Sequence, residues 1–291
     1  MEKNSPCLHF TVSPRQEEGN NMGFEEMLRK YFDKVLTEVD FVKKTYTALE
    51  KFGFNDENAI ASVCICRDEI SQSLRSIIKH VWGEAFNLSS LAAMFTAGKT
   101  GLLAAMHHAP RIDDRERYVF YVIPHIAIDE EGRIGFCSRK GIKESTACGA
   151  LNIFLKELGS NNPPTPNDKS PLPPFTKGGL GGITEKGGKG KGGLKRSAYK
   201  IDNDDIEMSL IRMRLLKELP YGHIPDLLEL TKITRKAIQT DLENALSKIV
   251  NTKKSDYALI TGIQINAPDG NYIWPAECYA FVNGIKKDVT L

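Results

Sequence analysis

Hydrophobic side chains follow two spacings along the chain, and each spacing predicts one kind of secondary structure. Over residues 24–52 the apolar positions recur mostly every three or four residues, as an amphipathic helix or a pair of helices requires. Residues 59–66 (AIASVCIC) are apolar and rich in β-branched side chains, which is typical of a buried strand. After Gly- and Ala-rich helical residues 88–107, residues 118–128 form a second such strand, in which Pro124 predicts an irregularity or a sheet edge.

Helical and strand patterns continue to alternate in the rest of the chain. Residues 145–158 (STACGALNIFLKEL) predict a helix with a Ser or Thr cap, which places Cys148 in its first turn. Helical periodicity returns over residues 204–250, and strand-like runs follow at residues 257–265 and 278–282. This alternation predicts an α/β fold.

Two stretches lack any such pattern. Residues 1–22 are polar and contain Pro and Gly, so we expect a flexible leader. At about residues 160–196 a Pro-rich segment gives way to repeats such as GGKGKGG, which contain too few apolar side chains to offset the entropy of ordering. The sequence therefore predicts a single domain over residues 23–291, interrupted by a disordered low-complexity insert.

Composition and charge narrow the class of protein. With 41% hydrophobic and 26% charged residues the chain is typical of globular proteins, and a net charge of +2 gives no general attraction to nucleic acid or membrane. The sequence shows neither a signal peptide nor about 18 consecutive apolar residues. We therefore expect a cytoplasmic protein, in which the six cysteines are thiols or metal ligands.

Three residues are candidates for a zinc site. Zinc prefers a tetrahedral set of sulfur and nitrogen ligands, and a catalytic site uses three protein ligands and leaves the fourth position to water. Cys66 and His125 stand near the ends of predicted strands and Cys148 near a helix start, where an α/β sheet gathers its functional groups. Their separations of 59 and 23 residues match no short zinc signature, so spacing alone is weak support. We expect the other cysteines after the leader to be buried thiols: Cys64, Cys137 and Cys278.

Longer motifs in the same regions point to a known family. The chain resembles the limiting-CO2-inducible protein B/C family, which is related to β-carbonic anhydrases, and the similarity covers most of the chain outside the leader and the insert. The motifs that carry this resemblance are SVCICRDEI (62–70), FNLSSLAAMFTAGKTGLLAAMHHAP (86–110), DRERYVFYVIPHIAI (114–128) and STACGAL (145–151).

The resemblance implies a ligand set and a fold. The family pattern of Cys before Arg-Asp-Glu, then Pro-His, then Ala-Cys-Gly matches at Cys66, His125 and Cys148. These three are therefore implied as ligands of Zn²⁺. The resemblance also implies a central β-sheet flanked by helices, as in β-carbonic anhydrases, and a homodimer as the working unit.

The resemblance further implies an Asp and an Arg beside the metal. β-Carbonic anhydrases carry a Cys-x-Asp-x-Arg pattern, in which Asp68 keeps the Asp here, whereas Ile70 stands at the Arg position. Arg67 is the nearest candidate partner for Asp68, and Arg117 is another. An ionised Asp68 can orient the zinc-bound nucleophile, or it can occupy the fourth zinc position and keep the enzyme off.

The expected function is that of a carbonic anhydrase, which converts carbon dioxide reversibly to bicarbonate and a proton. Zinc suits this reaction because it lowers the pKa of bound water from 15.7 toward about 7. The main alternative is an inactive zinc-binding relative in inorganic-carbon handling.

A DNA-binding regulator is a further alternative, because residues 223–249 resemble a helix-turn-helix with its turn near residues 231–234. Asp241 and Glu243 on the second predicted helix oppose this reading, and so does the lack of a wide basic surface. We therefore expect helices that pack on the sheet, and no nucleic-acid or membrane partner.

Overall fold

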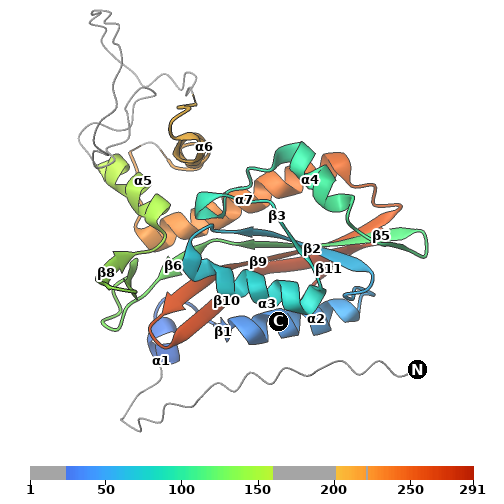
Figure 1. The fold of residues 1–291 in the computed structure, drawn as a ribbon, viewed down its shortest axis with the longest axis horizontal. Coiled ribbons are helices and arrows are strands. Elements are labelled where there is room, and N and C mark those ends of the chain that lie inside the picture. The colour runs from blue at the N-terminus through green and yellow to red at the C-terminus, as the bar shows by residue number, and fades with distance from the viewer. Residues whose placement is uncertain (1–23, 160–200, 221) are drawn as a thin grey trace, which may run out of the picture.

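A mixed β-sheet forms the centre of the computed structural model, which describes residues 24–159, 201–220 and 222–291 (Figure 1). Its main strands are, in spatial order, β1 (Leu36–Thr37), β10 (Gly270–Val282), β9 (Ser255–Ala267), β5 (Arg115–Ile123), β2 (Ala59–Ile65) and β3 (Ala85–Asn87). Three further strands pair at its margins: β11 (Ile285–Asp288) with β10, β4 (Arg111–Ile112) with β5, and β6 (His125–Ala127) with β9. Strands β3, β2, β5 and β9 run parallel, whereas β9, β10 and β1 are antiparallel neighbours.

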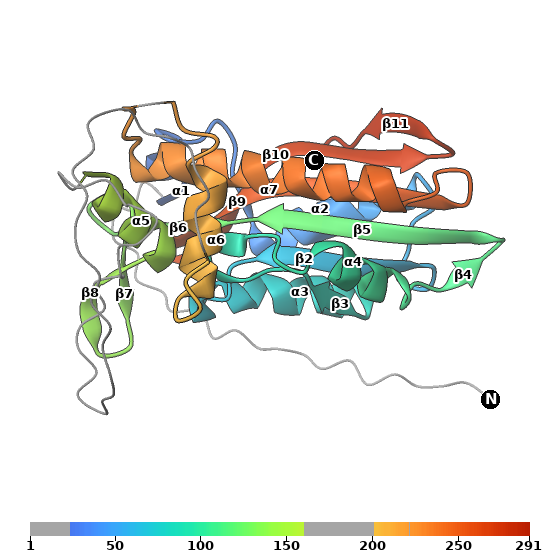
Figure 2. The same ribbon diagram turned by 90° about the horizontal axis from the view of Figure 1, so that it is seen from above.

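Helices cover both faces of this sheet, as Figures 1 and 2 show. One face carries α2 (Glu38–Glu50) and α3 (Gln72–Trp82), and the other carries α4 (Gly98–Met106), α5 (Gly149–Gly159), α6 (Ile206–Leu215) and α7 (Leu227–Ile249). Short helical segments complete the described chain: α1 (Phe24–Leu28), η1 (Glu69–Ser71) and η2 (Leu91–Ala93). The predicted α/β fold with a central sheet flanked by helices is confirmed.

The two hydrophobic cores follow from the alternation of side chains along the strands. In β9, Leu259 packs toward Leu230 of α7, whereas its neighbour Ile260 packs in the cluster that contains Phe41 and Ile78. All seven residues of β2 are buried, because a central parallel strand is covered on both faces.

The predicted strand over residues 118–128 is interrupted at Pro124. Strand β5 ends at Ile123, and β6 begins at His125 and continues along the same neighbour, with His125 opposite Gln264. Although Pro124 has no N–H to donate, its carbonyl accepts a hydrogen bond from the Gln264 N–H at 2.9 Å. The irregularity predicted from Pro124 is therefore present, and it turns His125 into the first residue of a short strand.

The predicted helix over residues 145–158 begins later in the structure than expected. Residues 145 and 146 lie in β8 (Ile142–Thr146), which forms a hairpin with β7 (Phe136–Arg139), and α5 begins only at Gly149. Cys148 consequently precedes the helix instead of lying in its first turn. The expected leader (residues 1–22) and almost all of the expected insert (about 160–196) lie outside the described residues.

The helix-turn-helix alternative is wrong, because residues 227–249 form one continuous helix, α7. Thr231 and Thr234, where the turn was expected, are buried, and their hydroxyls donate to the carbonyls of Leu227 and Leu230 at 2.7 and 2.8 Å. These backbone contacts one turn earlier satisfy both hydroxyls inside the helix.

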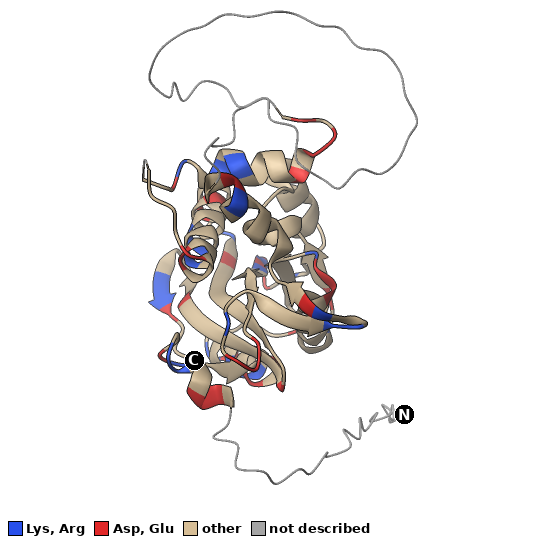
Figure 3. Cartoon of the chain, turned by 90° about the vertical axis from the view of Figure 1, so that its left-hand side faces the viewer, with Lys and Arg blue, Asp and Glu red and all other residues tan. Residues whose placement is uncertain are grey.

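The surface of the described chain carries both signs of charge. Viewed from the end that holds β7, β8 and α5, Lys and Arg alternate with Asp and Glu on helices and loops (Figure 3). Among the described residues, no helix combines the length and the hydrophobicity needed to cross a lipid bilayer.

Candidate metal centre

The structure brings together the three residues expected to bind zinc. Cys66 directly follows β2, His125 begins β6, and Cys148 directly precedes α5. The sulfurs of Cys66 and Cys148 are 3.8 Å apart, and the three potential ligand atoms all lie within 4.8 Å of one another. All three residues are buried. Strands β2 and β5–β6 are parallel, so their carboxyl ends deliver Cys66 and His125 to the same edge of the sheet.

The two thiols differ in acidity. The Cys66 and Cys148 sulfurs share a hydrogen bond in which either could be the donor, and this contact raises the pKa of Cys66 and lowers that of Cys148. The backbone N–H groups of Leu151 and Ala150, at the start of α5, also lower the pKa of Cys148. Cys148 is therefore the first of the two to become a thiolate, the form that binds metal.

The imidazole of His125 presents a free nitrogen to these sulfurs. Its Nδ1 is hydrogen-bonded to Oδ1 of Asn266 at 3.0 Å, whereas its buried Nε2 has no hydrogen-bond partner within the described chain. Burial lowers the pKa of His125, but Cys66, Asn266 and Asp68 together outweigh burial and the net shift is upward. A buried nitrogen without a partner is costly unless something binds it, so the cluster fits a metal ion.

A carboxylate–guanidinium pair lies beside the cluster. Oδ2 of Asp68 is 3.8 Å from Nε2 of His125. Arg139 of β7 donates to both carboxylate oxygens of Asp68, at 2.8 and 2.9 Å, and also to the carbonyl of Thr146 at 3.1 Å. Burial would raise the pKa of Asp68, but the hydrogen bonds from Arg139 and the nearby His125 give a net decrease. Asp68 is therefore ionised at neutral pH.

The guanidinium partner of Asp68 differs from the sequence prediction. The Arg67 side chain is 62% exposed and pairs with Glu207 at 2.9 Å. The other candidate, Arg117, lies at the start of β5 and approaches Asp256 at 3.9 Å. Sequence reasoning missed Arg139, which stands 71 residues after Asp68 and reaches it only because the β7–β8 hairpin folds back. No local spacing marks this contact.

The family model that describes limiting CO2-inducible proteins B/C, beta carbonic anhydrases, matches residues 35–282. The chain belongs to this family. A crystal structure of limiting CO2-inducible protein LCIB is 29% identical and superposes with a TM-score of 0.67, covering 91% of this chain and 98% of that one. PtLCIB4, a homologue of LCIB, shares the fold at 18% identity and a TM-score of 0.65, covering 91% and 99%. No curated protein sequence matches the chain.

Three other cysteines of this family member are described by the structure, and they lie outside the ligand cluster: Cys64, Cys137 and Cys278. Cys64 is buried in β2, and burial raises the pKa of its thiol. Burial also raises the pKa of Cys278 to about 11, and this thiol donates to the carbonyl of Thr261 at 3.7 Å. The prediction of buried thiols is confirmed for these two. It is wrong for Cys137, which is half-buried on the β7–β8 hairpin and lines a cavity.

The three candidate ligands are suited to zinc and would leave one coordination position for water or substrate. Two sulfurs and one imidazole nitrogen are three of the four donors of a tetrahedral zinc site, which is the catalytic pattern with one open position. Within the described residues this is the cluster of His, Cys, Asp and Glu side chains whose geometry could hold a metal ion. Together with the family, it defines a carbonic anhydrase-like protein with a candidate metal centre.

Proposed function

We propose that this protein catalyses the reversible hydration of carbon dioxide to bicarbonate and a proton, with zinc held by Cys66, His125 and Cys148. The observation that carries the proposal is the buried cluster of two sulfurs and an unpartnered imidazole nitrogen, with an ionised carboxylate beside it. Membership of a family of beta carbonic anhydrases supports carbon dioxide as the substrate.

The residues divide the chemical work. Bound zinc supplies Lewis acidity, which makes water a nucleophile near neutral pH. Asp68, kept ionised by Arg139, accepts a hydrogen bond from the attacking water and orients its lone pair toward the carbon of carbon dioxide. The oxygen–carbon bond forms, the product leaves as bicarbonate, and the proton released from water passes to solvent.

The position of Asp68 also supports a second candidate, a zinc-binding relative without catalysis. Its Oδ2 lies only 3.8 Å from Nε2 of His125, near enough to compete for the fourth metal position. Against this candidate, Arg139 engages both carboxylate oxygens, which supports the orienting role. The balance between these two contacts decides whether the centre is open to water.

The test is stopped-flow hydration of carbon dioxide by purified protein whose zinc content is measured on the same sample. We expect about one zinc per chain and inhibitor-sensitive catalysis. Cys66→Ser and Cys148→Ser should lose both zinc and activity, since a serine hydroxyl is a poor substitute for a thiolate. Cys64→Ser is the matched control, because this buried thiol lies on β2, two residues before Cys66 and outside the ligand cluster, and its variant should keep zinc.

Each outcome decides between the candidates. Zinc with catalysis supports the enzyme, and zinc without catalysis supports the inactive relative. Folded wild-type protein that binds no zinc contradicts both. The cytoplasmic location and the homodimer expected from the sequence stay predictions.

A further inference from the structure

The hydrogen bond on Nδ1 of His125 is the first of a chain of side-chain contacts that leads away from the metal cluster. We propose that Asn266 is a positioning residue that keeps the proton on Nδ1 of His125 and so directs the lone pair of Nε2 toward the two sulfurs. This inference rests on the proposed function, since it concerns the same metal centre. Asn266 is held in place by a series of side-chain hydrogen bonds that runs through Asn271 and Ser73 to Glu38.

The orientation of the Asn266 amide is fixed by a backbone carbonyl. Its Nδ2 donates to the carbonyl of Ile70 at 3.1 Å and to Oδ1 of Asn271 at 2.9 Å. A carbonyl only accepts hydrogen bonds, so the NH₂ group must face Ile70 and Oδ1 must face His125. Because Oδ1 also only accepts, Nδ1 of His125 must carry the proton.

The next two hydrogen bonds, from Asn271 and from Ser73, also have their donors on the side nearer His125. Nδ2 of Asn271 donates to the Ser73 hydroxyl at 3.0 Å, and that hydroxyl donates to Oε1 of Glu38 at 3.1 Å. Gln264 donates to the same carboxylate oxygen at 2.6 Å. All hydrogen bonds from His125 therefore point toward Glu38, a buried acceptor at the start of α2. Hydrogen bonds aligned in one direction polarise and strengthen one another.

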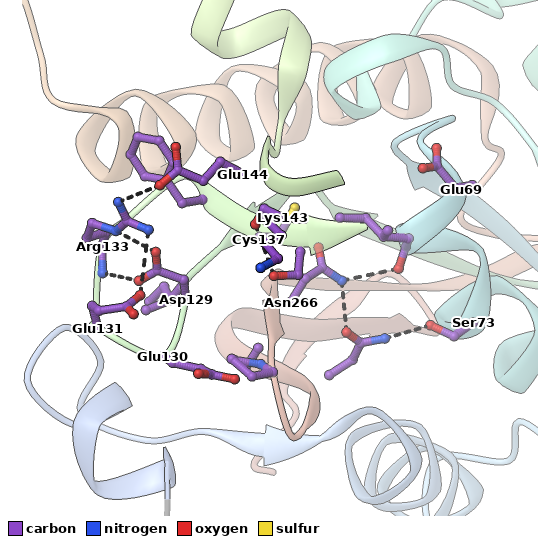
Figure 4. A pocket seen from close by; sticks show the side chains of 17 residues that line it. Glu69, Ser73, Asp129, Glu130, Glu131, Arg133, Cys137, Lys143, Glu144 and Asn266 are labelled. Carbon is purple, nitrogen blue, oxygen red and sulfur yellow. Dashed lines mark hydrogen bonds and ion pairs between the residues drawn. The ribbon is translucent and has the colours of Figure 1, made fainter. Parts of the chain in front are cut away.

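The chain joins elements that are distant in sequence. Asn266 and Gln264 lie on β9 beside β6, Ser73 lies in the first turn of α3, and Asn271 lies on β10. Asn266, Asn271 and Ser73 line the wall of a cavity of about 710 Å³, and Figure 4 labels Asn266 and Ser73 among the residues that line it. Asn266 thus contacts His125 and also lines this cavity.

The decisive measurement is zinc affinity, obtained by competition with a chromophoric chelator, together with the tautomer of His125 from ¹⁵N NMR of the full chain. For Asn266→Leu we expect zinc affinity to fall about 10- to 100-fold, the usual cost of losing a partner of a ligating histidine. Asn266→Asp keeps an acceptor for the Nδ1 proton and should recover part of that loss. Wild-type protein without added metal should show the Nδ1–H tautomer, and Asn266→Leu should show the Nε2–H form.

The matched control is Asn58→Leu, because Asn58 is also buried and also donates to a carbonyl, that of Gly53 at 3.0 Å, but lies in the loop before β2. It should reduce stability and leave zinc affinity unchanged. If Asn266→Leu does not fold, Asn271→Ala removes one support of Asn266 and should weaken zinc binding about two- to tenfold.

The results separate this inference from the proposed function. Wild-type zinc binding with unchanged affinity in Asn266→Leu would overturn the positioning role and leave the function standing. An Nε2–H tautomer in the wild-type protein would also overturn it. Absence of zinc from the wild-type protein would contradict the proposed function, and the tautomer measurement would still decide the role of Asn266.

Discussion

Asp68 and Arg139 show how one ion pair can set the chemistry of a buried site. The Asp68 side chain is 12% exposed and that of Arg139 is 16% exposed, so both charges are largely removed from water. The guanidinium donates to both oxygens of this carboxylate and, with the nearby His125, keeps it ionised. In the proposed reaction, Arg139 would therefore act through Asp68.

Removing Arg139 should impair catalysis more than metal binding. For Arg139→Leu we expect kcat/KM to fall about 10- to 100-fold, with zinc content unchanged. This variant would lack the group that opposes the effect of burial on the pKa of Asp68 most strongly, so that pKa should rise and the acid limb of the pH–rate profile should move to higher pH. Arg139→Lys should recover part of the activity, because lysine keeps the charge but loses the bidentate contact.

Arg67→Leu provides the comparison, because Arg67 was the partner expected from the sequence. Since Arg67 pairs with Glu207 at the surface, the Arg67→Leu variant should have the same pH–rate profile as the wild-type protein. A shift of the acid limb in Arg67→Leu but not in Arg139→Leu would contradict the assignment made from the structure.

At this scale the sequence predicts ligands better than their supports. Cys66, His125 and Cys148 stand out as candidate ligands because zinc restricts its ligands to a few residue types, and the family motifs surround them. Arg139 and Asn266 are common residue types without a local motif. Their roles depend on a hairpin and a sheet register that bring them to the site from 71 and 141 residues away.

Among the elements, the β9–β10 hairpin supplies the most support to the site, since it carries Gln264, Asn266 and Asn271. Its two strands approach closely where Gly262 faces Pro275, next to an irregularity in the register before Cys278. A Cβ atom on Gly262 would lie 2.7 Å from the backbone carbonyl oxygen of Trp274. Glycine is therefore required here by close packing of the backbone.

Gly262→Ala should lower the free energy of unfolding by about 1–3 kcal/mol, because the new methyl group meets backbone that cannot move aside independently. Urea denaturation measures this change. Gly159→Ala is the control, since a Cβ at the end of α5 meets nothing within 4 Å and alanine favours helix. Equal stability of the two variants would show that the hairpin relaxes around the methyl group.

The same hairpin shows where strand prediction from sequence stops. The predicted runs, residues 257–265 and 278–282, lie inside β9 and β10, but β10 begins at Gly270 and includes Pro275. A proline argues against a strand interior, but Pro275 stands beside the register irregularity that precedes Cys278. For α7 the sequence correctly predicts helix but wrongly allows a turn near residues 231–234. Threonine is common at helix caps, but Thr231 and Thr234 are buried within one long helix.

At the scale of the whole molecule, the alternation of strands and helices is enough to predict the class of fold. The order of strands in the sheet is not predictable in this way, because β10 and β9 enter between β1 and β5 from the far end of the chain. Burial of both faces by helices makes the central strands uniformly apolar, so their sequence does not record which neighbour they pair with.

Global stability should depend on pH through a charged contact at the other end of the central strands. Asp256 at the start of β9 is buried and accepts two hydrogen bonds from Arg115 of β5, at 2.5 and 2.9 Å. Burial raises the pKa of Asp256, but the hydrogen bonds from Arg115 and from the N–H of Asn283 lower it by more, so the net shift is downward. A lowered pKa in the folded state means that the ionised carboxylate stabilises the fold above the unfolded pKa of about 3.9.

This stabilisation should be lost as the pH falls through the folded pKa, because the unfolded chain binds the proton more readily. Asp256→Asn should therefore be less stable than the wild-type protein by about 3 kcal/mol at pH 7, as removal of one partner of a buried pair predicts. The difference should shrink below about pH 4. Urea denaturation at both pH values measures this difference.

Asp114→Asn is the matched control, because this carboxylate is 94% exposed in its pair with Arg111. The substitution should therefore change stability little at either pH. A difference for Asp256→Asn that does not depend on pH would mean that its cost comes from packing and not from the charge.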